Sequence, residues 1–297
     1  MNYKNYVLSL LLLFVLAAAS ANEKTGALLW RISGNGLEHP SYIFGTHHLY
    51  PISFLDSVAG LKTAFESSNQ VVGELLMYEM PKMMYELQRA GMMPQDTTWQ
   101  MLLSEDDYIY VDEKLSSLLG VGLQLLGILN PAMINMTVSV AFYQQIFPQA
   151  NQGESMDIWF QQQALLRDIP IIGLETVQDQ ITAIFDVASL KRQAADLICM
   201  LKNLDFTEYS IRKLNNLYRA ADLTALYEML WEESPCPWSS EQEIAINNTR
   251  NKNWLKKLPE IMAAEPSFVA VGALHLPGEA GLLVGLKKAG YTVEPVK

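Results

Sequence analysis

Short runs rich in β-branched and aromatic residues lie mostly near the two ends of the chain, and segments with helical periodicity fill the middle. The β-rich runs cover 27–33, 41–46, 71–76, 169–175, 267–272 and 291–295. Residues 80–168, and much of the chain from 176 to 258, show the apolar spacing of helices instead. This distribution predicts an α+β fold, with residues 22–297 as one domain that carries a helical insertion at about 80–168.

Two of these runs carry further local information. Gly34, Asn35 and Gly36 separate the first two runs, which predicts a β-hairpin. The run at 71–76 is almost wholly apolar, which is typical of a central strand, but it contains Glu74. Because a buried strand rarely holds an unpaired carboxylate, Glu74 is a candidate functional residue.

Residues 115–153, within the expected insertion, carry no charged side chain. Such a segment could contact a membrane or an apolar partner, or it could form core helices beneath a lid. Asn130, Pro131 and Asn135 interrupt it and leave no clean span of the ~18–20 apolar residues that a membrane helix needs. Core helices are therefore the favoured interpretation.

The N-terminal segment has the pattern of a signal peptide. Lys4 precedes an apolar run, and Ala19-Ser20-Ala21 supplies the small residues of a cleavage site after Ala21. The run is shorter than the ~20 residues that cross a bilayer, so we expect no stable membrane span after cleavage of residues 1–21. The mature protein is expected to be exported, and to be periplasmic or secreted.

The charge balance excludes some partners and the cysteines bear on the compartment. The chain has 32 acidic and 21 basic residues, a formal net charge of −11, and loss of Lys4 with the signal peptide makes it one unit more negative. Nucleic acids and anionic membranes need a basic surface, so neither is an expected partner.

In an oxidising compartment Cys199 and Cys236 either form a disulfide or remain free, and the sequence leaves both possibilities open. The sequence also leaves the oligomeric state open.

The most specific chemical signal is a pair of Gly-x-x-His motifs. Gly45 precedes His48, and Gly272 precedes His275, each at the end of an expected strand. Together with Glu74 these histidines form an N, N, O set that suits a divalent metal. A buried histidine is more often a hydrogen-bonded core residue, so the pattern by itself is weak. The chain lacks the His-Glu-x-x-His motif of zincins and the Gly-x-Ser-x-Gly elbow of serine hydrolases.

Six motifs in sequence order resemble the TraB/GumN family, which belongs to a superfamily with PrgY and the Tiki proteases. They are residues 42–48 (YIFGTHH), 71–75 (VVGEL), 156–157 (MD), 173–176 (GLET) with Gln180, 250–251 (RN), and 271–276 (VGALHL) leading to 290–293 (GYTV). The resemblance implies a mixed β-sheet flanked by helices, similar to Tiki, erythromycin esterase and ChaN-like folds. It also implies an active centre of His48, Glu74 and His275 that binds a divalent metal, manganese or cobalt rather than zinc. Because Tiki members are peptidases and TraB members restrain peptide pheromone signalling, it suggests a peptide or protein substrate.

The remaining candidates are residues with both a structural and a functional interpretation. Asp157 caps a helix or supports the metal ligands, and Glu175 either approaches Glu74 or holds Arg250 in a buried ion pair, which is the favoured alternative. Arg250 and Asn251 either lie on a solvated helix face or act on the substrate, the guanidinium clamping a carboxylate or stabilising an oxyanion.

Positions next to the motifs also matter. Gly45 and Gly272 would lie close to the ligands, whereas His47 replaces an apolar residue of the family pattern and is expected to support a ligand or to face solvent. Thr249 stands where the family often has glutamate, which puts a carboxylate role there in doubt.

These features predict an exported metal-dependent hydrolase that acts on peptides, with Glu74 as a metal ligand or general base. The alternative is a non-catalytic periplasmic protein that binds a metal complex, haem or a signalling peptide. In a third interpretation, the apolar 115–153 segment sequesters a peptide by contact alone.

Overall fold

The computed structural model of the protein describes residues 26–77, 80–150, 154–237 and 239–297. The expected signal peptide, residues 1–21, lies outside these ranges.

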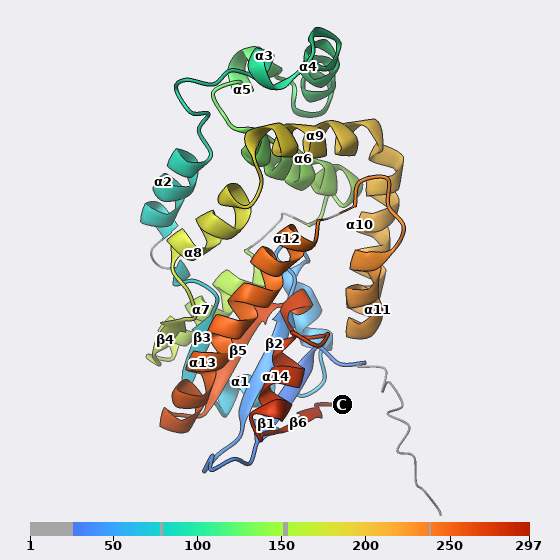
Figure 1. Ribbon diagram of the computed structural model, residues 1–297. Coiled ribbons are helices and arrows are strands. Elements are labelled where there is room, and N and C mark those ends of the chain that lie inside the picture. The colour runs from blue at the N-terminus through green and yellow to red at the C-terminus, as the bar shows by residue number, and fades with distance from the viewer. Residues whose placement is uncertain (1–25, 78–79, 151–153, 238) are drawn as a thin grey trace, which may run out of the picture.

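A six-stranded mixed sheet organises the fold, in the order β4-β3-β5-β2-β1-β6 (Figure 1). The four strands β4, β3, β5 and β2 are parallel, whereas β1 is antiparallel to both β2 and β6. The α+β prediction is confirmed. The strands are β1 (Leu29–Ser33), β2 (Ser41–Thr46), β3 (Gln70–Gly73), β4 (Ile171–Gly173), β5 (Ser267–Gly272) and β6 (Thr292–Pro295).

The predicted hairpin joins β1 to β2. Gly34, Asn35 and Gly36 all have positive φ (76°, 48° and 86°), which glycine and asparagine tolerate better than other residues. The turn sets the register in which Leu29 lies opposite Phe44. This register directs the Phe44 side chain into the core, where it is fully buried.

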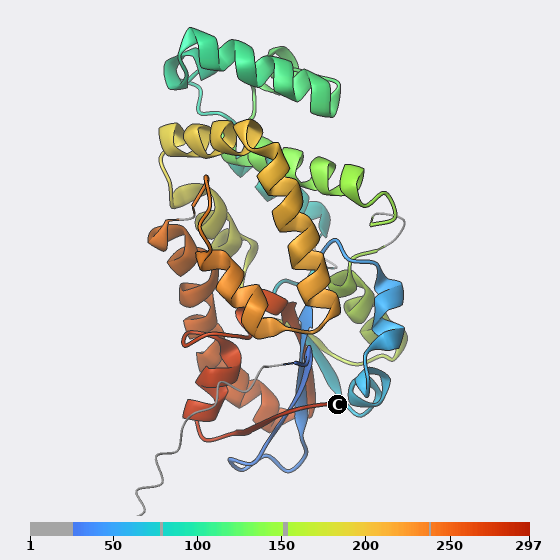
Figure 2. The same ribbon diagram turned by 90° about the vertical axis from the view of Figure 1, so that its right-hand side faces the viewer.

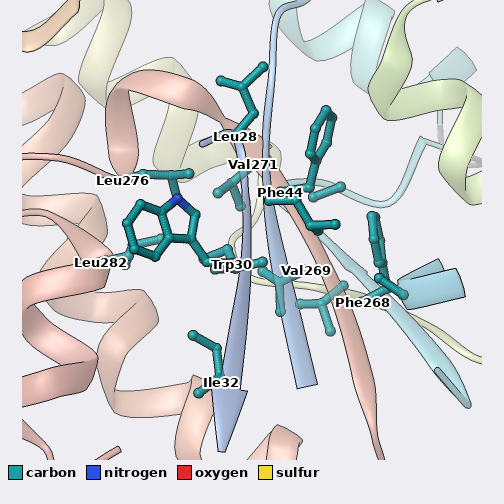
Figure 3. Close-up of a cluster of buried hydrophobic side chains, with 14 of the residues drawn as sticks. Leu28, Trp30, Ile32, Phe44, Phe268, Val269, Val271, Leu276 and Leu282 are labelled. Carbon is teal, nitrogen blue, oxygen red and sulfur yellow. The ribbon is translucent and has the colours of Figure 1, made fainter. Parts of the chain in front are cut away.

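Helices cover both faces of the sheet, which Figure 2 views nearly edge-on. On one face lie α1 (Leu61–Glu66) and α7 (Met156–Leu166); on the other lie α13 (Thr249–Ala264) and α14 (Leu282–Lys288). Figure 3 shows Phe44 and Phe268 on one side of the strands, with Trp30, Leu276 and Leu282 on the other.

The core on the α7 face consists of packed aromatic rings. The ring of Phe160 lies 4.7 Å from that of Phe268 and 5.6 Å from that of Phe44. Because Phe160 is fully buried, truncation to alanine would cost about 3–5 kcal/mol of stability. This packing fixes the N-terminal end of α7 against the sheet.

The remaining helices lie mostly beyond the C-terminal edge of the parallel strands (Figure 1). They are α2 (Met80–Ala90), α3 (Trp99–Leu102), α4 (Glu105–Leu119), α5 (Leu123–Leu126), α6 (Pro131–Ile146), α8 (Val177–Ile181), α9 (Leu190–Lys202), α10 (Leu204–Arg219), α11 (Leu223–Glu228) and α12 (Ser240–Glu243). Short 3-10 segments are η1 (Ile52–Ser57), η4 (Met229–Trp231) and η6 (Ala273–His275), and π-helical segments are η3 (Thr182–Asp186) and η5 (Ile244–Asn248).

A second hydrophobic core joins α3, α4, α5, α6 and α9, and we call these five helices the helical cap. Its buried members are Trp99, Val111, Leu115, Leu123, Ile134, Val138, Ala194, Leu197 and Leu201. The last three belong to α9, outside the expected 80–168 insertion, whereas α7 lies inside that range but packs on the sheet.

The apolar 115–153 segment contributes α5, α6 and the end of α4 to the cap. Leu115 and Ile134 are fully buried there, in agreement with core helices. None of the helices in the described part of the chain combines the length and apolar character needed to cross a membrane.

The structure also shows the state of the two cysteines and the form of the segment between β2 and β3. The cysteines are paired: a Cys199–Cys236 disulfide links α9 to the loop before α12. Between β2 and β3, the chain forms η1 and then α1, and Gly60 separates the two in a left-handed conformation (φ 71°).

Candidate functional site

The candidate residues come together at the C-terminal edge of the four parallel strands. In register, Thr46 of β2 lies beside Gly272 of β5, and Gly73 of β3 beside Gly173 of β4. The segments that follow these strands carry His48, His275, Glu74 and Glu175. In sheets of parallel strands this edge is where functional groups gather, because the loops there extend outward from rigid strands.

Glu74 is the central carboxylate. It lies just after β3, which ends at Gly73, so the expectation that it sits in the middle of a strand is wrong. Its Oε1 accepts a hydrogen bond from the Gly272 N–H (2.8 Å), and its Oε2 accepts from Arg250 (2.6 Å) and Gln180 (3.3 Å). Burial alone would raise the Glu74 pKa, but the charges of His275, Arg250 and His48 and the Gly272 N–H outweigh burial and hold it at about 2. Because the structure keeps His275 neutral, we assign the largest part of this effect to Arg250. Glu74 is therefore ionised and weakly basic.

Arg250 is bound on every side. Its Nε and Nη2 groups donate to Glu175, Nη2 also donates to Glu74, and Nη1 donates to the Ile246 carbonyl (3.0 Å) and to His275 Nε2 (3.1 Å). These bonds engage all five N–H groups of the guanidinium. Its side chain is only 12% exposed, so a solvated helix face is ruled out. A substrate carboxylate could bind Arg250 only if one of these bonds broke.

Glu175 anchors the other side of the guanidinium. It accepts from Arg250 Nη2 (2.6 Å) and from the indole Nε1 of Trp254 (3.1 Å), and its side chain is 4% exposed. The buried ion pair expected for Glu175 is present. Trp254 follows Arg250 by four residues on α13, so both side chains lie on one helix face. That spacing is the signal that could have identified Trp254 as more than packing.

Asn251 determines which nitrogen of His275 carries the proton. The Asn251 amide nitrogen donates to the carbonyls of His275 (3.2 Å) and Ala280 (3.0 Å), so its Oδ1 is the acceptor for His275 Nδ1–H (2.7 Å). Burial lowers the His275 pKa to about 4, and the neutral ring therefore presents the lone pair of Nε2. That lone pair already accepts the Arg250 N–H.

His48 and Asp157 form the accessible part of the site. Asp157 Oδ2 lies 2.7 Å from His48 Nδ1, and Asp157 Oδ1 accepts from the Thr46 hydroxyl (2.8 Å). Ser155, not Asp157, is the N-cap of α7, so Asp157 is free to orient the histidine. The charge of Asp157 raises the His48 pKa to about 9. The His48 side chain is 62% exposed and can be reached from solvent, whereas the Asp157 side chain is 12% exposed.

Gly45 and Gly272 provide space in which these groups approach. A Cβ on Gly272 would lie 3.3 Å from Glu74 Oε1 and 3.9 Å from His48 Nε2, so both atoms face the same point beside the strand. A Cβ on Gly45 would lie 2.9 Å from the Ala273 Cα and would push the two strand ends apart. Among the described residues, His48 Nε2 has no hydrogen-bond partner.

His47 faces away from these groups, toward the cap. Its Nδ1 accepts from the Leu49 N–H (3.2 Å), so its Nε2–H donates to Asn215 Oδ1 (3.1 Å), and Asn215 also bonds Tyr143. Burial lowers the His47 pKa to about 4. His47 is thus neither a solvent-facing residue nor a support of the His48 ring. No sequence motif marks Asn215, whereas Thr46 and Gln180 belong to the family-like motifs but had no predicted role.

The residues as arranged do not fit a divalent metal held by His48, Glu74 and His275. No group of three or more histidine, cysteine, aspartate or glutamate residues in the described ranges is placed to hold an ion. The reason is visible in the contacts: Arg250 donates to both Glu74 and His275 Nε2, and the latter has a single lone pair. Of the two histidines in this set, His48 is the one whose Nε2 has no hydrogen-bond partner among the described residues.

Comparison with known proteins gives one finding. The model of the TraB/PrgY/gumN family matches residues 28–295, nearly the whole chain. No curated protein and no solved structure matches significantly. Since the family match includes every strand, both Gly-x-x-His motifs and the residues around Glu74, the chain belongs to the TraB/PrgY/gumN family.

Proposed function

We propose that the protein is an exported hydrolase of peptides in which His48 activates the attacking water. The observation that carries the proposal is the His48–Asp157 pair, with a 2.7 Å bond at Nδ1 and an open Nε2 that faces Glu74 across Gly272. A histidine oriented by a carboxylate, with its second nitrogen free, is the common arrangement of a general base.

The proton transfers follow from this geometry. In neutral His48, the Nδ1–H donates to Asp157 and Nε2 carries the lone pair. Nε2 takes a proton from water as the water oxygen bonds to the substrate carbonyl carbon. His48 then returns that proton to the departing nitrogen as the C–N bond breaks. Since the His48 pKa is about 9, the unprotonated fraction of His48 rises with pH and levels off above that value.

The other polar residues are less suited to this role. Glu74 is a weak base because its pKa is about 2. His275 Nε2 already accepts a hydrogen bond from Arg250. Glu74 and His275 instead lie beside the position of the attacking water, where their hydrogen bonds keep the charge and shape of the site fixed.

Two features support export and a peptide substrate. The Cys199–Cys236 disulfide suits an oxidising compartment, in line with the signal peptide expected from the sequence. The Tiki and TraB resemblance favours peptides as the substrate class. The divalent ion expected from that resemblance is not part of this proposal, because Arg250 occupies two of the three expected ligands.

The test is a peptide-library digestion analysed by mass spectrometry, with wild type, His48→Asn and His39→Asn. His39 is exposed and precedes β2, whereas His48 follows β2, so His39 lies at the opposite end of that strand and is a matched control for loss of a histidine. We expect cleavage by wild type and His39→Asn but not by His48→Asn. Peptide binding without cleavage by any of the three, or a Soret band on addition of haem, would instead favour the non-catalytic binding protein.

A further inference from the structure

We infer that the Arg250 guanidinium is the resident cation of this site: it occupies the place of a divalent ion, and its removal creates a metal site. The inference concerns binding at the Glu74–His275 pair and does not depend on peptide hydrolysis.

Two possible ligand atoms beside Arg250 are spaced for a shared ion: His275 Nε2, which accepts from Arg250, and Glu74 Oε1, the carboxylate oxygen that accepts from Gly272. His275 Nε2 and Glu74 Oε1 lie 3.8 Å apart. Two ligands that each lie about 2.0–2.2 Å from one ion are at most ~4.4 Å apart, so this spacing is compatible with coordination. Glu74 and His275 therefore have a spacing that metal ligands can have, but the cation beside them is a guanidinium.

The guanidinium bonds to the atoms that an ion would need. Nη2 lies 2.6 Å from Glu74 Oε2 and Nη1 lies 3.1 Å from His275 Nε2. Asn251 holds the His275 proton on Nδ1, so Nε2 has one lone pair and cannot serve a metal and Arg250 together. An ion could bind His275 only after Arg250 Nη1 had left.

Contacts on the far side oppose that departure. Glu175 binds Nε and Nη2, the Ile246 carbonyl of η5 binds Nη1, and the guanidinium carbon lies 4.9 Å from the centre of the Trp254 ring. If Arg250 moved out, Glu175 would remain as an unpaired carboxylate with 4% exposure. The cation is thus fixed by the fold and does not depend on Glu74 alone.

Replacement of Arg250 by methionine should allow a divalent ion to bind at this site. It frees the His275 Nε2 lone pair and leaves Glu74 and Glu175 without their cation. Two carboxylates and an imidazole, with His48 nearby, form an O, O, N set that suits manganese, cobalt or zinc. The substitution removes the one positive charge beside two carboxylates, and a divalent ion would balance both of them.

The experiment measures metal directly. Wild type, Arg250→Met, Arg250→Met/His275→Ala and the control Arg167→Met are dialysed against Co²⁺, and bound metal is quantified by elemental analysis and by visible absorption. Arg167 is a suitable control because it also donates to several protein groups, the carbonyls of Phe65, Glu66 and Ser68, but lies far from the site.

We expect about one Co²⁺ per chain in Arg250→Met, and little in the other three proteins. About one Co²⁺ per chain in both wild type and Arg167→Met would overturn the inference, since the ion would then bind with the guanidinium in place. Equal, low binding by wild type and Arg250→Met would also overturn it, because the guanidinium would not be what excludes the ion. Circular dichroism checks that each variant folds. Arg250→Gln, which keeps an amide donor, is the second variant. The wild-type result stands whether or not either variant folds.

Discussion

Replacement of Arg250 by methionine should strongly destabilise the protein at neutral pH. Arg250 is the shared partner of Glu74 and Glu175, whose side chains are 8% and 4% exposed. Removal of one partner from a buried ion pair typically costs about 3–5 kcal/mol, because the remaining charge stays buried without compensation. Here two carboxylates remain, so the free energy of unfolding should fall by at least about 3 kcal/mol.

The loss should shrink on acidification. In the wild type the Glu74 pKa is held at about 2, so this group adds stability above its unfolded pKa, and that stability is lost as the pH falls toward 2. In Arg250→Met the unpaired carboxylates prefer the protonated form. Their destabilising effect is therefore largest above the unfolded pKa and fades below it.

Urea unfolding at pH 7 and pH 4.5, with the disulfide intact and a chelator present, measures both effects. Arg31→Met is the control: its partner Glu294 is 57% exposed, and such surface pairs contribute about 0–1 kcal/mol. If Arg250→Met unfolded within about 1 kcal/mol of wild type at pH 7, the assignment of Arg250 as a buried structural cation would be refuted.

Three further predictions use other parts of the structure. Asp157→Asn should move the rising limb of the pH–rate profile from about 9 toward the ordinary histidine value near 6.5, because Asp157 is the main cause of the raised His48 pKa; an unmoved limb in initial-rate measurements would contradict this. Gly272→Ala should raise the activation free energy of the reaction, measured from kcat, by more than it lowers the free energy of unfolding, because the new Cβ would lie 3.3 Å from Glu74 Oε1. A kcat equal to that of wild type would show that the point beside Gly272 is not part of the site. Serine in place of both Cys199 and Cys236 should lower stability by about 2–4 kcal/mol in urea unfolding, since the disulfide closes a loop with a sequence separation of 37; an unchanged midpoint would contradict that estimate.

The sequence predicted the strands well because their apolar, β-rich runs and glycine turns are local signals. The hairpin around Asn35 and the apolar run that ends just before Glu74 are examples. The two Gly-x-x-His motifs also pointed to one edge of the sheet, because the C-terminal ends of parallel strands meet there.

What the sequence did not predict depends on contacts between distant segments. The Arg250–Glu175 ion pair was expected, but the bonds of Arg250 to Glu74 and His275 depend on α13 meeting the segments that follow β3 and β5. The surroundings of His47 were also missed, because its hydrogen bond goes to Asn215, which is far away in the sequence. The cap includes α9 because of tertiary packing at Leu197, which no boundary signal near residue 168 reveals.

The most direct test of the account is the initial rate of hydrolysis of one cleaved peptide by wild type, before and after exhaustive chelation, and by His48→Asn. If His48 activates water beside a fixed guanidinium, chelation should leave the wild-type rate unchanged, and His48→Asn should lower it about 10²–10⁴-fold. Loss of activity on chelation with recovery on return of the metal, or a His48→Asn rate equal to that of wild type, would contradict the account.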